Sequence, residues 1–326
     1  MRRTLRRLVM TTSVALLCWV LATGPTALAG ARTWTLLRPA LPSPPRAAMT
    51  MEYDPVSRFV VTFGGFDETG QYLNQTWIWD GIEWAQPIVQ TPPPARAGAD
   101  MAFDFVTQQL VLYGGFDGSN YLGDTWTWTG SNNSWTHRQT ATHPPRVSGP
   151  MLFTDPLNGH VDMFGGFDGM FYQNQTWQWT GTDWTQLHPA TSPTARGAAV
   201  ADLDRANHTV VLFSGLADLN AYDTWTWDGV TWTRQSPAHQ PPARYYSASA
   251  YEPALHGVVI FGGGSGGRDL NDTWYWNGGD WTKLNAGIPP ARRESHGMAW
   301  DPDMGSIVMF GGMVNGQTVA SDTWGL

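Results

Sequence analysis

Short apolar runs alternate with polar loops along most of the chain, in a pattern that recurs six times. The second copy is typical: the apolar run at residues 111–113 ends in Gly114 and Gly115, a polar loop follows, and residues 125–128 alternate threonine with tryptophan. Alternation at a period of two residues predicts β-strands. Each copy contains four such segments, and the last is marked by one more tryptophan, such as Trp135.

The copies recur at a nearly fixed period. Their glycine pairs, or the Ser-Gly that fills the fourth position, begin 50, 51, 49, 48 and 49 residues apart. The starting residues are Gly64, Gly114, Gly165, Ser214, Gly262 and Gly311. A fixed period of this length is typical of arrays in which each unit buries its apolar face against its neighbours. Four-stranded units of this length pack as blades around an axis, so the sequence predicts an all-β, six-bladed β-propeller.

The two ends of the chain complement each other in this pattern. Residues 32–37 read as a strand whose Trp34 occupies the position of the last tryptophan of a unit, although no glycine pair precedes it. The sixth unit begins a ladder at residues 322–324 but lacks that final strand. An open array would leave exposed strand edges. We therefore expect the N-terminal strand to complete the last blade and close the ring.

The first 29 residues differ from the repeats. Four arginines precede an apolar stretch at residues 14–22, and Ala27-Leu28-Ala29 precedes Gly30. This pattern is typical of a secretory signal peptide. We expect cleavage to leave one propeller domain at residues 30–326, secreted to an extracellular or periplasmic location. The open alternative is an uncleaved anchor, but the stretch is well under the ~20 residues of a spanning helix, so no membrane span is expected after cleavage.

Composition narrows the classes of partner. The only cysteine, Cys18, lies in the expected signal peptide, so disulfides would not stabilise the domain. Without the four signal arginines, 15 of the 19 basic residues remain against 27 acidic residues, a net charge of −12. Contacts with phosphates need a basic surface, so nucleic acid is not an expected partner.

The repeat resembles a known family. An apolar run ending in Gly-Gly and followed by two spaced aromatics resembles the kelch repeat, as do the Pro-Ala-Arg segments and Asn271-Asp272-Thr273-Trp274. The resemblance covers residues 32–326, with Ser214 as its main departure. It implies a propeller, often six-bladed, of the type found in the central domain of galactose oxidase. It does not fix the function, because the fold hosts both enzymes and binding modules.

Residues that recur in nearly every copy meet a requirement of all blades, so we expect them to be structural. One threonine slot is filled in all copies: Thr76, Thr125, Thr176, Thr224, Thr273 and Thr323. The preceding residues are expected to bond buried backbone or the arginines that start each blade: Gln75, Asp124, Gln175, Asp223, Asp272 and Asp322. Those arginines are Arg46, Arg96, Arg146, Arg196, Arg244 and either Arg292 or Arg293. The alternative is a ring of guanidiniums that reads anions at the channel mouth. The kelch resemblance implies partner binding by arginines at this place, together with residues just after the glycine pair.

The loops after the glycine pairs and between blades differ most among the copies, so we expect the binding surface there. Aromatic side chains with polar tips suit sugar rings or peptide side chains; the alternative is that they only pack loops onto the blades. The candidate binding residues are Phe66, Tyr72, Phe116, Tyr121, Phe167, Tyr172, Tyr222, Arg268, Arg293 and Glu294. These residues predict a secreted, monomeric kelch-type propeller that binds a protein or a glycan without a cofactor or metal.

An enzymatic alternative also remains open. The chain is similar in size and expected export to the sialic acid mutarotases, which are kelch propellers. That resemblance implies a cofactor-free sugar mutarotase or isomerase. Arg293, Glu294 and His296 would then supply acid–base chemistry in an axial pocket. Galactose oxidase activity is excluded, because its copper centre needs a cysteine-linked tyrosine and residues 30–326 contain no cysteine.

Overall fold

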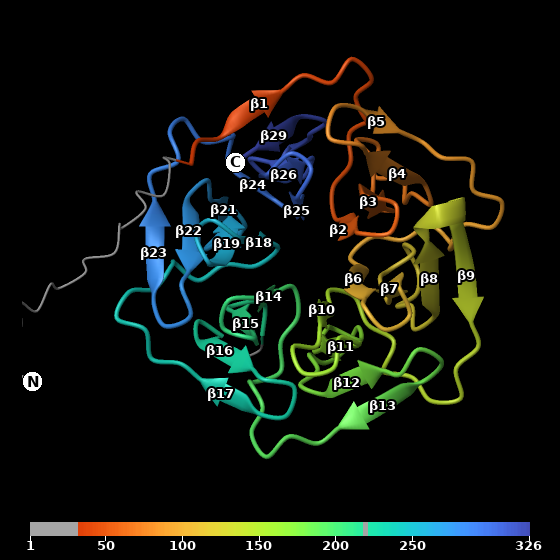
Figure 1. The fold of residues 1–326 in the computed structure, drawn as a ribbon, viewed down its shortest axis with the longest axis vertical. Helices are drawn as coiled ribbons and strands as arrows, with labels where there is room; N and C mark the ends of the chain where they lie inside the picture. The colour runs from red at the N-terminus through yellow and green to blue at the C-terminus, as the bar shows by residue number, and fades with distance from the viewer. Residues whose placement is uncertain (1–31, 218–220) are drawn as a thin grey trace, which may run out of the picture.

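The computed structural model describes residues 32–217 and 221–326, and the expected signal peptide lies outside these residues. The described part of the chain forms six four-stranded antiparallel sheets. The sheets surround a common axis as blades of a propeller (Figure 1). The all-β propeller predicted from the repeat is therefore confirmed.

Each blade starts at the axis and runs outward. Blade 1 contains β2 (Thr50–Asp54), β3 (Phe59–Phe63), β4 (Thr76–Trp79) and β5 (Trp84–Ala85). Blade 2 contains β6 (Asp100–Asp104), β7 (Gln109–Tyr113), β8 (Thr125–Thr129) and β9 (Ser134–Arg138), with the 3-10 turn η1 (Gly130–Asn132) between the last two. Blade 3 contains β10 (Met151–Thr154), β11 (Val161–Phe164), β12 (Thr176–Trp179) and β13 (Trp184–Leu187).

The second half of the chain repeats this order. Blade 4 contains β14 (Val200–Asp204), β15 (Thr209–Phe213), β16 (Thr224–Trp227) and β17 (Trp232–Arg234). Blade 5 contains β18 (Ala248–Glu252), β19 (Gly257–Phe261), β22 (Thr273–Trp276) and β23 (Trp281–Leu284). Blade 6 contains β25 (Gly297–Asp301), β26 (Ser306–Phe310), β29 (Thr323–Gly325) and β1 (Thr35–Leu37). Two small sheets complete the described structure: β20 (Gly264–Ser265) pairs with β21 (Arg268–Asp269), and β24 (Arg293–Glu294) pairs with the hairpin of β27 (Met313–Val314) and β28 (Thr318–Val319).

The N-terminal strand forms the outer edge of the last blade. Strand β1 pairs antiparallel with β29, and Thr35 lies opposite Gly325. In Figure 1 the red first strand accordingly lies beside the dark blue last strand. Two segments from opposite ends of the chain thus share one sheet.

A closed circle of backbone hydrogen bonds surrounds the axis where the chain enters each innermost strand. Each amide donates to the carbonyl of the equivalent residue in the preceding blade, with N–O distances of 2.7–3.0 Å. This axial circle consists of Ala48, Gly98, Gly149, Ala198, Tyr246 and Ser295. All its members have left-handed φ angles between 51° and 65°. Such angles are costly for residues other than glycine. The hydrogen bonds of the circle therefore hold its alanine, serine and tyrosine members in a backbone conformation that these residues disfavour.

The recurring threonines accept hydrogen bonds from the last tryptophan of the next blade. The indole Nε1 of Trp184 in blade 3 donates to Oγ1 of Thr125 in blade 2 over 2.8 Å. The equivalent pairs are Trp135–Thr76, Trp232–Thr176, Trp281–Thr224, Trp34–Thr273 and Trp84–Thr323. The threonines are therefore structural, as expected. Their hydroxyl groups matter as well as their β-branched shape.

Replacing Thr125 with valine tests this role of the hydroxyl. Valine keeps the shape and the strand preference but leaves the buried indole N–H of Trp184 without its acceptor. An unsatisfied buried donor costs about 1–3 kcal/mol, and we expect that loss in the free energy of unfolding measured by urea denaturation. The exposed Thr185 on β13 offers a matched control, since Thr185→Val should change stability little. Equal stability of the two variants would contradict the assignment.

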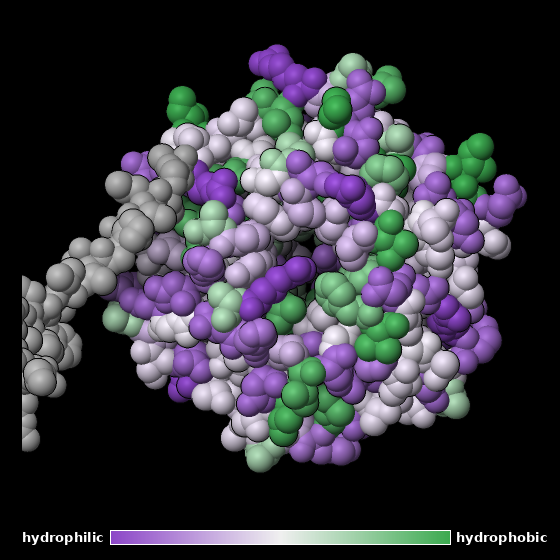
Figure 2. Space-filling model, in the orientation of Figure 1, coloured by the Kyte–Doolittle hydropathy of each residue, from purple (hydrophilic) through white to green (hydrophobic). Residues whose placement is uncertain are grey.

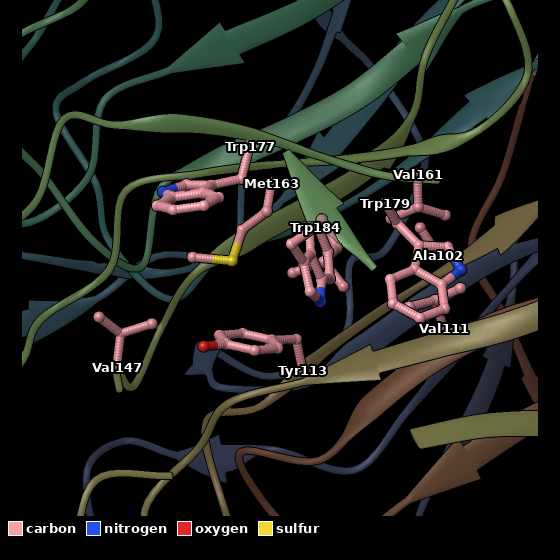
Figure 3. Close-up of a cluster of buried hydrophobic side chains, with 10 residues drawn as sticks. Ala102, Val111, Tyr113, Val147, Val161, Met163, Trp177, Trp179 and Trp184 are labelled. Carbon is pink, nitrogen blue, oxygen red and sulfur yellow. The ribbon is translucent and has the colours of Figure 1, made fainter. Parts of the chain in front are cut away.

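Apolar side chains fill the space between neighbouring blades. Figure 3 shows the cluster between blades 2 and 3, where Tyr113 from β7 faces Trp184 from β13. Their ring centroids lie 5.4 Å apart in an edge-to-face arrangement, which stabilises aromatic pairs. Val111 and Met163 belong to the same cluster and are at most 1% exposed. The apolar runs of the repeat are thus the second strands, buried on both faces.

Candidate functional site

The arginines that start the blades are buried in clamps with the residues that precede the threonines. Both terminal nitrogens of Arg96 donate to the Asp124 carboxylate over 2.7 Å, and Nη1 also donates to the Gly114 carbonyl over 3.0 Å. The equivalent clamps are Arg196–Asp223, Arg244–Asp272 and Arg293–Asp322, and Arg46 donates to Gln75. The expected pairing is confirmed.

These clamps remove the arginines from the surface. Each clamp arginine is at most 1% exposed, so the alternative of a guanidinium ring that reads anions at the channel mouth is wrong. Arg293, a candidate binding residue, is one of them. Its guanidinium is held by Asp322 and by the Gly311 carbonyl, and it belongs to the scaffold of blade 6.

Blade 3 lacks the clamp. The amide of Val147 donates to the Leu122 carbonyl, as the amide of Arg96 donates to that of Leu73. Val147 therefore fills the arginine slot, and Arg146 is displaced by one residue to an exposed position. The assignment of Arg146 to the ring of blade-starting arginines is wrong, because backbone register rather than residue type decides the slot. The Tyr113 hydroxyl donates to the Pro144 carbonyl beside it.

Aromatic side chains from the post-glycine loops of blades 1–3 form one row. We call this row the aromatic crescent; it consists of Phe66, Tyr72, Phe116, Tyr121, Phe167 and Tyr172. Successive rings from Tyr72 onward contact each other with centroids 6.0, 5.0, 5.8 and 4.9 Å apart. Each phenylalanine also bridges through its backbone to the tyrosine of its own loop. All six side chains stay half-buried, so they pack the loops and still offer a surface.

The crescent borders a cavity of about 150 Å³ near the axis. Phe116, Tyr121, Phe167 and Tyr172 line it, together with Tyr246 of the axial circle. Tyr246 is 39% exposed. Burial raises the pKa of its hydroxyl above the ordinary value. Sequence reasoning missed Tyr246, although the other copies carry only alanine, glycine or serine in its slot.

The remaining candidate binding residues lie elsewhere on this face. Tyr222, Arg268 and Glu294 are not among the residues that line the cavity. Arg268 is exposed in the β20–β21 hairpin, and Glu294 is half-buried in β24. Blade 5 thus carries a charged hairpin where blades 1–3 carry aromatic loops, and the corresponding hairpin of blade 6, at residues 313–319, is uncharged.

The residues proposed for acid–base chemistry do not share an open pocket. Arg293 is held in its clamp, and His296 is buried with its ring 5.5 Å from that of Phe261. Burial lowers the pKa of His296 to about 3, so the imidazole is neutral near pH 7 and does not serve as an acid there. The geometry offers no support for catalysis by this group.

Three carboxylates that sequence reasoning did not single out line the axial channel, a cavity of about 200 Å³. Burial raises the pKa of Glu52 to about 8, of Asp100 to about 7 and of Asp202 to about 6. Asp100 accepts hydrogen bonds from the amides of Met101 and Leu152, both over 2.8 Å. Figure 2 shows that the molecular surface is hollowed at its centre.

Two further features of the described residues bear on the class of protein. Among residues 32–217 and 221–326, no group of three or more His, Cys, Asp or Glu side chains could hold a metal ion. Within the same residues, no helix is long and apolar enough to cross a membrane.

Comparison with known proteins places the chain in a family. Residues 29–189 match the model of the KLHDC2/KLHL20/DRC7 Kelch-repeats domain. No curated protein matches the chain significantly. The matched residues contain β1 and blades 1–3, and blades 4–6 repeat the same indole–threonine bonds and arginine clamps. The chain belongs to the kelch-repeat family.

Proposed function

We propose that this protein is an exported binding module that takes a protein ligand on the aromatic crescent. Kelch-repeat propellers serve as protein-binding modules, and the signal pattern of residues 1–29 supports export. The observation that carries the proposal is the continuous row of half-exposed rings around the cavity beside Tyr246.

The chemistry of the crescent suits an inserted side chain. A cavity of about 150 Å³ is large enough for one apolar or aromatic side chain of a partner. Rigid tyrosines contribute contact area at low entropic cost and add hydroxyl groups that can bond a partner backbone. The proposed ligand is therefore an exposed loop or a chain end of an extracellular or periplasmic protein.

Truncating two tyrosines of the crescent tests this proposal. Peptides are first selected by phage display on the purified protein, and their Kd values are then measured for variants by calorimetry. We expect Tyr121→Ala combined with Tyr172→Ala to weaken the selected peptides by about tenfold or more, as for aromatic hot spots. Tyr222→Ala is the matched control, because this exposed tyrosine does not line the cavity.

Two outcomes would contradict the proposal. One is equal peptide affinity of the double variant and the parent protein. The other is selection of glycans, rather than peptides, by a glycan array probed with the same protein. That result would support the carbohydrate ligand left open by the sequence.

A further inference from the structure

A third cavity opens at the opposite end of the innermost strands. Its volume is about 440 Å³, which lies within the range of small-molecule sites. Its aromatic lining comes from several blades: Tyr53, Phe103, Phe105, Tyr251 and Trp300. These residues lie at or beyond the ends of strands that begin near the axial circle. We call this cavity the vestibule, since it is remote from the aromatic crescent and shares no lining residue with the crescent cavity.

Two carboxylates connect the vestibule to the axial channel. Glu52 and Asp202 line both cavities. They belong to blades 1 and 4, which face each other across the axis (Figure 1). The two groups are near enough for their charges to repel each other. Within the part of the chain that the structure describes, neither of them forms an ion pair.

The charged groups of the vestibule do not balance. Arg58 forms an ion pair with Asp303 at the rim, so these two charges cancel. Arg205 then remains as the cation that faces Glu52 and Asp202, while Asp100 adds a further carboxylate in the channel. A partly buried carboxylate without a counter-charge is unfavourable. Near neutral pH the raised pKa values of Glu52 and Asp100 let protons neutralise part of this charge, and a bound cation would take the place of those protons.

Arg205 illustrates how a cation fits this chemistry. Its guanidinium lies over the ring of Phe105, 5.9 Å from the centroid. The same group is near enough to favour the ionised forms of Glu52 and Asp202. Arg205 follows β14 and is exposed, so it occupies the mouth of the vestibule rather than its interior.

We propose that the vestibule binds an aliphatic ammonium ion, with its charge beside Glu52 and Asp202 and its hydrocarbon chain on the aromatic wall. The aromatic side chains offer apolar area that removes the hydrocarbon chain from water, which is favourable. A hydrated inorganic cation would gain little from such a wall, whereas a neutral alcohol of the same shape would lack the charge. The site is independent of the crescent and of the protein ligand proposed for it.

Calorimetric titration with n-butylammonium chloride tests the proposal, with sodium chloride and n-butanol as matched probes. We expect saturable binding of butylammonium alone, and affinity that rises between pH 5.5 and pH 8.5 because bound protons must leave the carboxylates. Glu52→Gln and Asp202→Asn should each weaken binding by about tenfold or more. Glu68→Gln, in an exposed loop of the crescent face, should leave it unchanged.

A variant that is expected to strengthen binding separates a specific effect from loss of the fold, because an unfolded protein would bind less tightly and not more tightly. Arg205→Ala removes the resident cation from an exposed turn and should tighten butylammonium binding. The proposal is overturned if butylammonium does not saturate the protein, if butanol binds equally well, or if the carboxylate variants keep the parent affinity. Tyr121→Ala with Tyr172→Ala should bind butylammonium normally, so failure of the crescent proposal and failure of this one are distinguishable.

Discussion

Replacing Arg96 with valine is expected to lower the free energy of unfolding by about 3 kcal/mol, because breaking a buried ion pair leaves an uncompensated charge. The guanidinium is buried and makes a two-pronged contact with Asp124, whose side chain is 25% exposed. That partial exposure places the cost at the lower end of the range for buried pairs. Urea denaturation followed by circular dichroism measures the loss.

The chain supplies its own controls for this prediction. Arg146→Val makes the same chemical change at an exposed arginine outside any clamp, and it should change stability by less than about 0.5 kcal/mol. Blade 3 carries Val147 and Gln175 in the two clamp slots. Arg96→Val combined with Asp124→Gln introduces the same pair of residues into blade 2. It should recover part of the stability lost by Arg96→Val alone. Similar stability of Arg96→Val and Arg146→Val would refute the clamp as a stabilising contact.

The blade pattern could be predicted because it follows from local requirements repeated in every copy. Gly114 and Gly115 have φ angles of 75° and 103°, which favour glycine and so mark the end of each second strand. The tryptophan and threonine positions recur because each pair must meet across a blade boundary. The partners of the arginines could be inferred for the same reason.

The exceptions could not be predicted from residue type alone. Arg146 fits the spacing of the blade-starting arginines in the sequence. The backbone hydrogen bonds are shifted by one residue, however, and place Val147 at the position that the arginine occupies in the other blades. Glu52 and Asp202 lie far apart in the sequence, and only the circular arrangement of blades brings them to one cavity. Tyr246 could have been identified by comparing the six copies of the repeat, because it is the one large side chain at a position that is otherwise alanine, glycine or serine.

The protein is expected to lose stability as the pH rises from 5 to 9. The folded-state pKa is raised to about 8 for Glu52, about 7 for Asp100 and about 6 for Asp202. Between the ordinary carboxyl pKa values and these raised values, the folded state holds protons that the unfolded state has released. The free energy of unfolding then falls by about 1.4 kcal/mol per pH unit for each such proton. The contribution is complete below about pH 4 and is lost as the pH passes through the raised values.

The arginine clamps act in the opposite direction at lower pH. Arg96 and Arg244 help to hold the pKa of Asp124 and Asp272 below the ordinary value, so these contacts weaken only in acid. Stability should therefore be highest near pH 4 and decline on the alkaline side. Thermal unfolding across pH 4–9 measures the profile, and Glu52→Gln combined with Asp100→Asn should flatten its alkaline side. A parent protein equally stable at pH 5 and pH 9 would show that these carboxylates are hydrated in solution.

Butylammonium bound beside Glu52 and Asp202 should reduce the loss of stability at alkaline pH. Its positive charge would stabilise the two ionised carboxylates in the folded state after they have lost their protons.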